Sequence, residues 1–587
     1  MPRQHVNKES VSRVIVWLRN DLRITDNRIM SAASAFCGVP TIFLFCFDPR
    51  HYSAAARTTL LGAPRCGAPR AKFLRESVLD LRQNLRSLGS DLLASLDTPE
   101  NTISGLATPN SVVVVQSEPA YDEHQTVQNV RRIVLQKGGE LREIEFGGVL
   151  FLRSELPFED NLSNLPNVFT KFRTAVEQHC TIVKPSPAPE AGAFGPVILE
   201  RDLFAQEPPV LCGYKVVPTE KDMGFDTGAF NEVSQRQQAL GVMTFTGGET
   251  AGTERLRRWM FDHDHLKNYF NTRNGMLGEA SSSKLSPWLA NGCLSVRVVA
   301  AECRRYETTR GIKNKSTRWL VFELLWREFF RLLVEKFGAR TFSARGMRGN
   351  ERNWSQDSEM LHQWMEGHTG VPLVDASMRE LATTGWMSNR ARQNVASYFV
   401  HNLGMDWRLG AEYFESLLLD SDVYLNYGNW NAAAGLTGGR VNVFNQLKQS
   451  KAYDPEGAYI KHWCPELAKL PVPLCFEPWK VPHARLTEFG IAVGSQRFRV
   501  PTTDPGPSHK TPKRRTRRHL VQNAKSHKFD IGSTQHRRDI NQSNTKGPTK
   551  YKTKPKKNKK HTGSKRLQSE WALTMHGSVM SSLCNKN

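Results

Sequence analysis

Residues 374–439 combine helical periodicity with polar side chains that most helical cores would not accept. Val374, Met378 and Leu381 recur at helical spacing, and Gly385 ends that segment. Two further predicted helices follow, rich in tyrosine, phenylalanine and leucine. Because a buried polar group needs a hydrogen-bond partner, the pattern favours a pocket for a large, flat, partly polar ligand over a plain core. The polar residues that crowd this region are Asn389, Arg392, Asp420, Asp422 and Asn426.

Other interpretations of the same stretch stay open at this point. Helices with interspersed tryptophans are commonly plain core, and a pairing of Arg392 with an aspartate can be a structural salt bridge. The run DSDVYLN is similar to a calcium loop, but Tyr424 and Leu425 stand where the EF-hand pattern requires an oxygen ligand and glycine. We therefore expect no metal site, and we expect DSDVYLNYGNW to form a turn-rich loop.

The first 150 residues alternate predicted strands with predicted helices. Apolar runs such as RVIVWL, TIFLFCF and SVVVV indicate strands buried on both faces, and glycines close the helical segments between them. This alternation predicts an open, mostly parallel, Rossmann-like α/β sheet. Ligands of such sheets bind beyond the carboxyl ends of the strands, and Glu118 follows a strand at such an end. An acid in that position can also be merely solvated. The sheet has no GxGxxG, so a dinucleotide is not expected on this domain.

Length and composition set the remaining boundaries. A chain of 587 residues is too long for one core, and we expect an α/β domain over residues 12–150, an interdomain connector over 151–240 and an all-helical domain over 241–480. The net charge is +23, and residues 508–570 hold twenty lysines and arginines against three acidic residues. We expect residues 496–587 to be a disordered basic extension that acts as a nuclear-import or nucleic-acid-binding patch, or merely as a solubilising appendage.

Several classes of protein are not favoured. The ten cysteines include no CxxC pair, so neither a zinc site nor a disulfide framework is indicated. No apolar run approaches the length needed to span a membrane, and no secretory signal is visible. We expect an intracellular monomer. The basic tail and the lack of a clear presequence favour the nucleus or cytoplasm, with an organelle left open.

Motifs in the second half resemble one known family. GWMSNRARQ, DWRLG, LLLDSDV and NYGNWN closely resemble the flavin-binding half of the photolyase/cryptochrome family, in its DASH branch. LPNVFTKFR, TRNGMLGEASSSKLSPWLANGCLS and FELLWREFFR match the same family in the same order, and the resemblance covers about residues 12–480. It implies an antenna domain over the predicted sheet and an FAD-binding domain over the predicted helices.

The resemblance also implies how the cofactors are held. From the residues alone, SSSKLSPW offers phosphate a helix start with free N–H groups, or is an ordinary N-cap. The family match places Ser282, Ser283, Leu285 and Ser286 on the segment that holds the FAD pyrophosphate. It assigns Glu118 to the pterin of a 5,10-methenyltetrahydrofolate antenna. The other residues that it assigns to FAD are Tyr269, Arg273, Arg327, Asn389, Arg392, Asp420, Asp422 and Asn426.

Substrate and electron-transfer residues follow from the same match. Glu323 and Trp326 are implied to line a pocket for a flipped-out pyrimidine pair, together with Gln393, which is characteristic of the DASH branch. The same match implies an electron relay of three tryptophans, with Trp430 innermost. These are Trp354, Trp407 and Trp430, which composition alone assigns to the core. Asn426 matches the residue that faces flavin N5.

One position departs from the pattern. Ala432 stands where the family carries a second pocket aromatic, often tyrosine in DASH proteins, and its loss removes ~1–3 kcal/mol of base stacking. The sequence therefore predicts a blue-light-driven, FAD-dependent lyase that splits cyclobutane pyrimidine dimers, chiefly in single-stranded DNA, with RNA as a further candidate partner. The alternatives are a photoreceptor that signals through flavin photoreduction and a light-independent nucleic-acid binder.

Overall fold

The computed structural model describes residues 10–198 and 217–491, together with Pro501, Thr503 and Pro505. Apart from these three residues, the basic extension that the sequence predicts over 496–587 lies outside the described residues. Among the described helices, none combines the length and the apolar character needed to cross a bilayer.

The N-terminal part is a five-stranded parallel sheet, as the alternating pattern predicts. The central strand β1 (Arg13–Leu18) pairs with β2 (Thr41–Cys46) on one side and β4 (Ser111–Gln116) on the other, so that Ile15 lies between Ile42 and Val113. The outer strands are β3 (Leu92–Ser95) and β5 (Glu140–Ile144), which gives the order β3-β2-β1-β4-β5. β2, β3 and β4 are buried along their whole length, which explains their continuous apolar runs.

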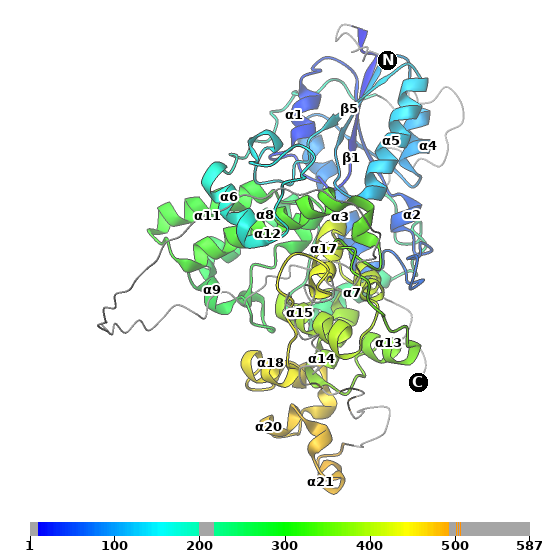
Figure 1. The fold of residues 1–587 in the computed structure, drawn as a ribbon. Helices are drawn as coiled ribbons and strands as arrows, with labels where there is room; N and C mark the ends of the chain where they lie inside the picture. Colours follow the sequence, from blue (N-terminus) through cyan, green and yellow to red (C-terminus); the bar gives the residue numbers. More distant parts are fainter. Residues whose placement is uncertain (1–9, 199–216, 492–500, 502, 504, 506–587) are drawn as a thin grey trace, which may run out of the picture. The chain divides into compact units, whose positions relative to one another are not determined.

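Helices cover both faces of this sheet (Figure 1). The short helix α1 (Arg28–Ser34) lies on one side, and α4 (Pro99–Leu106) and α5 (Tyr121–Gln136) lie on the other. Ile103 and Val130 from these two helices join the core cluster that contains Ile15 and Val113. The remaining helices of this part are α2 (Pro49–Tyr52) and α3 (Ala68–Ser87).

The strand order places a switch point beside β1. The chain builds β1, β2 and β3 outward on one side and then returns to add β4 and β5 on the other. The loops that leave β1 and β4 therefore run in opposite directions and open a crevice at the carboxyl edge of the sheet. Arg19 and Asn20 follow β1 there, and Glu118 follows β4.

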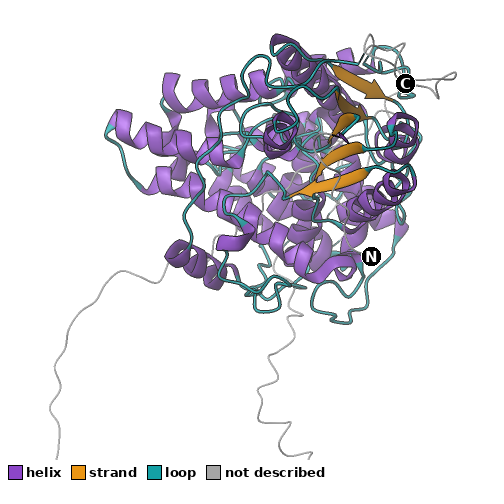
Figure 2. Cartoon of the chain, turned by 90° about the horizontal axis from the view of Figure 1, so that it is seen from above, coloured by secondary structure: helices purple, strands orange, loops and turns teal. Residues whose placement is uncertain are grey.

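The second part is helical, and Figure 2 shows the strands gathered at one side of the molecule with helices over the rest. Its core includes Met378, Phe399, Trp407, Phe414 and Trp430. The helices are α8 (Glu249–Arg257), α9 (Tyr269–Thr272), α10 (Ser286–Ala290), α11 (Val296–Arg310), α12 (Lys315–Phe337), α13 (Ser358–Met365), α14 (Pro372–Thr384), α15 (Asn389–Ser397), α16 (Trp407–Leu417), α17 (Val423–Ala433), α18 (Gln446–Tyr453), α19 (Ala458–Trp463), α20 (Val472–Cys475) and α21 (His483–Glu488).

The predicted loop DSDVYLNYGNW is wrong, because the chain is helical from Val423 as α17. The Asp422 side chain accepts a hydrogen bond from the backbone N–H of Leu425 at 3.2 Å and so caps the helix start. The asparagines and glycine that signal a turn lie in the helix interior, where packing against α12 and α16 overrides their weak helix propensity. A Cβ on Gly428 would stand 2.8 Å from the Phe330 ring, so glycine permits the close contact with α12.

The described residues of the range 151–240, predicted as a connector, include two α-helices. They are α6 (Phe169–His179) and α7 (Ala229–Leu240). Both bury apolar side chains: Phe172 and Val176 from α6, and Phe230 and Val233 from α7. The segment between them has no helix where it is described and includes residues 199–216, which lie outside the described residues.

Buried polar contacts join the sheet to the helical part. Arg297 of α11 donates through Nε to Asp26 Oδ2 at 2.8 Å, and Ser295 donates to the same oxygen. Asp26 Oδ1 accepts from the backbone N–H of Ser186 at 2.9 Å. Glu249 of α8 accepts from the N–H of Ile24 at 2.7 Å. One loop after β1 is thus fixed to two helices and to the connector.

Candidate functional site

A cavity in the helical part gathers most of the residues that the sequence predicts for FAD. Its wall comes from the segment 282–286, from one face of α12 and from the start of α15. The predicted residues on this wall are Tyr269, Arg273, Ser282, Ser283, Leu285, Ser286, Arg327, Asn389 and Arg392. Residues far apart in the sequence therefore meet at one place, as a ligand site requires.

Lys284 completes the serine-rich side of this cavity and was not among the predicted site residues. Its backbone φ is +53°, and its Nζ donates to Ser281 Oγ at 3.0 Å and stands 5.2 Å from the centre of the Trp386 ring. Burial lowers the pKa of Lys284 to about 7. A lysine inside the motif SSSKLSPW was the available signal, because a buried lysine needs an anionic or polar partner.

Arg392 presents a guanidinium to the same cavity. It donates through Nη2 to both carboxylate oxygens of Asp420, at 3.1 and 3.2 Å, and through Nε to the carbonyl of Met387 at 2.7 Å. Its Nη1 is buried without a hydrogen-bond partner among the described residues. A buried guanidinium N–H in this state suits an acceptor supplied by a ligand. Asp420 itself does not line the cavity and acts as the counter-ion of Arg392.

Arg327 on α12 is paired with an aspartate, as Arg392 is. Its Nη1 donates to Asp422 Oδ2 at 2.7 Å, and its Nη2 donates to Tyr424 Oη at 2.5 Å and to the Leu289 carbonyl at 3.1 Å. Asp422 stands behind Arg327 with respect to this cavity. The aspartate that caps α17 thus also neutralises a buried arginine.

Two predicted amides hold buried acceptors. Asn389 Oδ1, at the start of α15, and Asn426 Oδ1, in α17, have no hydrogen-bond partner within the described chain. Asn426 donates through Nδ2 to the Ala411 carbonyl at 2.9 Å and does not line the cavity.

The chemistry of the wall fits FAD. Unpaired buried atoms, serine hydroxyls and three arginines suit a ligand that carries a diphosphate and a ring with hydrogen-bonding edges. The cavity measures about 100 Å³, smaller than the ~300–1,000 Å³ common for ligand pockets. The fit therefore rests on the donors and acceptors of the lining and not on its size.

Glu323 and Trp326 were predicted to line one pocket for the substrate, and of these two residues Glu323 borders the cavity described above. Glu323 faces the cavity with the FAD set, where it accepts from Trp319 Nε1 at 3.1 Å and from the Tyr269 hydroxyl. Trp326 is 5% exposed and stacks on Phe169 of α6, with ring centroids 3.6 Å apart and planes 9° apart. A spacing of three along a helix shifts direction by about 60°, which is enough to place the two side chains on different neighbours.

The remaining predicted substrate residue, Gln393, is buried. Gln393 accepts a hydrogen bond from Arg390 Nη1 at 2.8 Å, within α15. Ala432, near the end of α17, is buried as well and leaves its position without an aromatic ring.

The three predicted relay tryptophans lie near one another at the α16–α17 contact. Trp354 and Trp407 both donate through Nε1 to the carbonyl of Ala344, at 3.1 and 3.4 Å. Trp430 packs against Gly410, one turn along α16 from Trp407, so closely that a Cβ there would meet its ring at 2.3 Å. Trp407 and Trp430 are fully buried, whereas Trp354 is partly exposed. The set therefore runs from the surface into the core.

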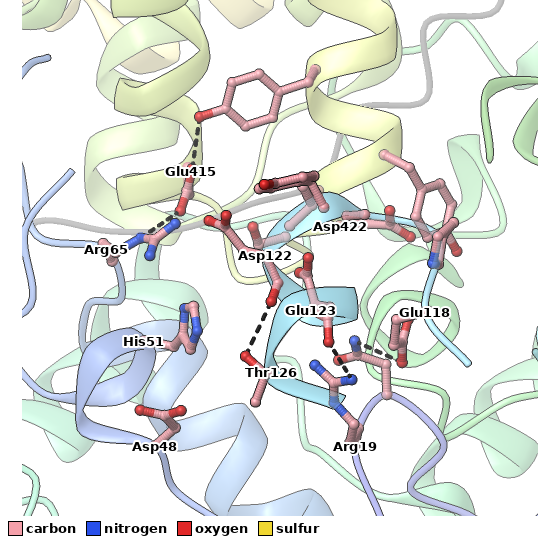
Figure 3. A pocket seen from close by; sticks show the side chains of 18 of the residues that line it. Arg19, Asp48, His51, Arg65, Glu118, Asp122, Glu123, Thr126, Glu415 and Asp422 are labelled. Carbon is pink, nitrogen blue, oxygen red and sulfur yellow. Dashed lines mark hydrogen bonds and ion pairs between the residues drawn. The ribbon is translucent and has the colours of Figure 1, made fainter. Parts of the chain in front are cut away.

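A second cavity, of about 470 Å³, lies at the switch point of the sheet. Figure 3 shows Arg19, Glu118 and Glu123 from the sheet part and Glu415 and Asp422 from the helical part around it. Glu118 accepts from Gln116 Nε2 at 3.2 Å and from Asn20 Nδ2 at 3.3 Å. Burial raises the pKa of Glu118 to about 8, so the carboxyl group keeps its proton at neutral pH. A protonated acid in a cleft can donate as well as accept a hydrogen bond.

Sequence reasoning found Glu118 in this cavity but missed most of its lining. Burial lowers the pKa of His51 to about 4, so this ring is neutral at pH 7. Tyr424 and Tyr427 of α17 also line the cavity. Asp422 connects the two cavities, since it borders this one and pairs with Arg327, which borders the other.

Comparisons with known proteins agree with this architecture. A family described as the FAD binding domain of DNA photolyase matches residues 319–517, and one described as DNA photolyase matches residues 14–190. Cryptochrome DASH of Gloeobacter violaceus is 42% identical, over 83% of this chain and 92% of its own length. The protein named "Cryptochrome DASH, chloroplastic/mitochondrial" of Ostreococcus tauri is 39% identical, over 84% of this chain and 93% of its own.

Solved structures lead to the same family. The cryptochrome of Synechocystis sp. PCC6803 superimposes with a TM-score of 0.75 at 38% identity, covering 84% of this chain and 97% of its own. A bacterial class III photolyase from Agrobacterium tumefaciens gives 0.68 at 26% identity, covering 84% and 95%. With a parallel sheet that matches the DNA photolyase family, a helical part that matches its FAD binding domain and relatives of this similarity along most of its length, the chain belongs to the cryptochrome/photolyase family, in its cryptochrome DASH branch.

Proposed function

We propose that this protein is a blue-light-dependent DNA photolyase that splits cyclobutane pyrimidine dimers, chiefly in single-stranded DNA. The observation that carries the proposal is the cationic, serine-lined cavity of the helical part, whose core also contains Trp407 and Trp430. Membership of the cryptochrome/photolyase family supports both FAD and DNA as partners.

Different residues of the cavity contact different parts of FAD in this proposal. Lys284 and Arg392 supply positive charge to a diphosphate, and Ser282 and Ser283 supply hydroxyl groups. On the cavity wall Asn389 offers a buried amide to the edge of a ring system, and Asn426 of α17, which is off this wall, has a second buried amide oxygen without a partner among the described residues. An amide beside the flavin adds no negative charge, which favours the electron-rich form of the cofactor. Bound there, FAD supplies the absorption of blue light and the electron that opens the cyclobutane ring.

The tryptophans supply electrons from outside. Trp354 is partly exposed, and Trp407 and Trp430 lead inward to α17, which also carries Asn426. Dry aromatic packing around Trp430, by Phe399, Phe414 and Trp364, keeps water away from the innermost indole.

Single-stranded DNA is the favoured substrate for two physical reasons. Flipping a dimer out costs a few kcal/mol of unstacking and least in a single strand. Ala432 also lacks the ring that would contribute ~1–3 kcal/mol of stacking. The binding energy available to offset the opening of a duplex is therefore smaller. The second cavity, with protonated Glu118, supports a folate antenna.

Cofactor content is the first test. Gently purified protein is expected to release a yellow compound with the absorption of FAD on denaturation. Arg392→Met is expected to lower FAD content strongly, because it removes a cavity cation. Arg379→Met is the matched control, since this arginine pairs with Glu466 and does not line the cavity. Absence of FAD from the wild type, with no uptake of added FAD, would contradict the proposal.

Repair is the second test. Reduced protein is illuminated with dimer-containing oligonucleotides, single-stranded and double-stranded, and repaired sites are counted by chromatography of the products. We expect light-dependent repair that is faster on the single strand. An FAD-loaded protein that repairs neither substrate excludes the lyase and leaves the photoreceptor alternative.

A further inference from the structure

Tyr427 links the tryptophans to the second cavity. Its ring lies 6.3 Å from that of Trp407, centroid to centroid, at an interplanar angle of 83°. Its hydroxyl donates to Glu415 Oε2 at 3.0 Å, and it lines the 470 Å³ cavity at the sheet edge. No role was expected for this tyrosine from the sequence.

The hydrogen-bond acceptors of these aromatic groups differ in basicity. Trp354 and Trp407 donate to the carbonyl of Ala344, and a backbone carbonyl does not take up a proton. The Tyr427 hydroxyl faces a carboxylate, which does. Oxidation of a phenol makes it a strong acid, so a tyrosine can give up an electron readily only where a base receives the proton. Among Trp354, Trp407 and Tyr427, the tyrosine has such a partner.

We propose that Tyr427 reduces oxidised Trp407 in a proton-coupled step, with Glu415 as the proton acceptor. The inference rests on the proposed function, in which photoexcited flavin is the oxidant that draws an electron from Trp407 by way of Trp430. One electron then passes from Tyr427 to the Trp407 radical cation, and the phenolic proton passes to Glu415 Oε2. The products are neutral Trp407, a neutral tyrosyl radical at 427 and a protonated Glu415, so electrons and charge balance.

The surroundings of Glu415 are compatible with this transfer. Its other oxygen, Oε1, accepts from Arg65 Nε at 3.2 Å (Figure 3), so Oε2 can take a proton while the contact with Arg65 persists. The Arg65 charge opposes protonation, and the acidity of an oxidised phenol outweighs it. Burial, together with the Glu415 carboxylate, holds the pKa of Tyr427 well above its usual value. The tyrosine therefore does not ionise beforehand, and loss of its electron and proton is coupled.

The step gives the oxidised Trp407 a second electron donor besides Trp354. Trp354 leads to the surface of the helical part, whereas Tyr427 leads into the cavity between α17 and the sheet. A reductant or antenna molecule bound in that cavity would meet the tyrosyl radical directly.

Electron paramagnetic resonance on the full chain with oxidised FAD tests the step. Samples are frozen during illumination, in a Trp354→Phe background that blocks the surface outlet. We expect a tyrosyl spectrum that narrows when tyrosine is ring-deuterated. Tyr427→Phe is expected to abolish it and to leave a tryptophanyl signal, and Glu415→Gln to reduce it severalfold, because an amide takes up no proton. Tyr413→Phe is the matched control, since that hydroxyl donates to the Met365 carbonyl.

A flavin-independent arm separates this inference from the proposed function. Azide radicals generated by pulse radiolysis oxidise tryptophan directly, and the growth of tyrosyl absorbance is followed as tryptophanyl absorbance decays. Slower or smaller growth in Tyr427→Phe than in wild type and Tyr413→Phe supports the step. Identical traces in all three overturn it. If light produces no tryptophanyl radical but this arm shows the difference, the proposed photochemistry fails and the Tyr427 step stands.

Discussion

At the scale of single residues, Glu118 makes stability depend on pH. In the unfolded chain the carboxyl group loses its proton near its usual pKa of 4.5, whereas the folded protein keeps the proton up to about pH 8. Between these values the folded state binds more protons, so the free energy of unfolding falls as pH rises. We expect Glu118→Gln to flatten this slope and to be more stable than wild type above pH 8, measured by urea unfolding from pH 5 to 9. Glu190→Gln, on an exposed loop, should keep the wild-type slope.

Lys284 is expected to make the affinity for FAD depend on pH. Its charge is lost as pH rises through about 7, and the loss removes an attraction for a diphosphate. We expect the affinity of FAD-free protein for FAD to fall above pH 7, by at most about tenfold per pH unit, in a fluorescence titration. Lys284→Arg keeps its charge and should bind with little pH dependence. A wild-type affinity that rises with pH would contradict the assigned contact.

These residues show what the sequence can and cannot predict about the site. The motif around 282–286 and Arg392 were predicted and meet at one cavity, with Asp420 as the counter-ion of Arg392 off the cavity wall, because their polar atoms have few other partners in an apolar core. The shared lesion pocket of Glu323 and Trp326 stays a prediction, and the sequence did not indicate that Trp326 stacks on Phe169, because this contact depends on the position of α6. Lys284 was missed, since its burial depends on tertiary packing and not on its neighbours in the sequence.

At the scale of elements, the contact between α16 and α17 depends on the absence of a side chain. A Cβ at position 410 would stand 2.3 Å from the Trp430 ring. We expect Gly410→Ala to destabilise the protein by ~1–3 kcal/mol through overpacking. The higher helix propensity of alanine offsets ~1 kcal/mol of this loss. Urea midpoints measure the change. The double variant Gly410→Ala/Trp430→Phe should recover part of the loss, and equal stability of Gly410→Ala and wild type would exclude the tight contact.

Element prediction succeeded where the pattern was continuous. The sheet strands have uninterrupted apolar runs, and their burial on both faces makes such runs necessary. The helix α17 was predicted as a loop because Asn426, Gly428 and Asn431 are common in loops. Tertiary packing and the Asp422 cap make this stretch helical. α7 was missed for a related reason, since it follows a Pro- and Gly-rich run and begins directly after Gly228.

At the scale of the whole molecule, the buried pair Asp26–Arg297 holds the sheet against the helical part. Both side chains are almost fully shielded from solvent, and removing one partner leaves an uncompensated charge. We expect Arg297→Met to cost ~3–5 kcal/mol and to turn one cooperative unfolding transition into two, seen by comparing circular dichroism with flavin fluorescence. Asp26→Asn/Arg297→Met should cost less than the single variant, because neither charge is then buried alone. A single, unshifted transition in Arg297→Met would show that other contacts suffice.

The 470 Å³ cavity gives its occupant influence over the folding of both parts. Its wall includes Glu118 from the sheet and Tyr427 from α17, so a small molecule seated there touches both and binds weakly to either alone. Mass action then raises the melting temperature of sheet and helices together as the molecule is added, by RT ln(1 + [L]/Kd). Calorimetry with increasing concentrations of the proposed folate tests this dependence, and the melting temperature is expected to rise with each addition.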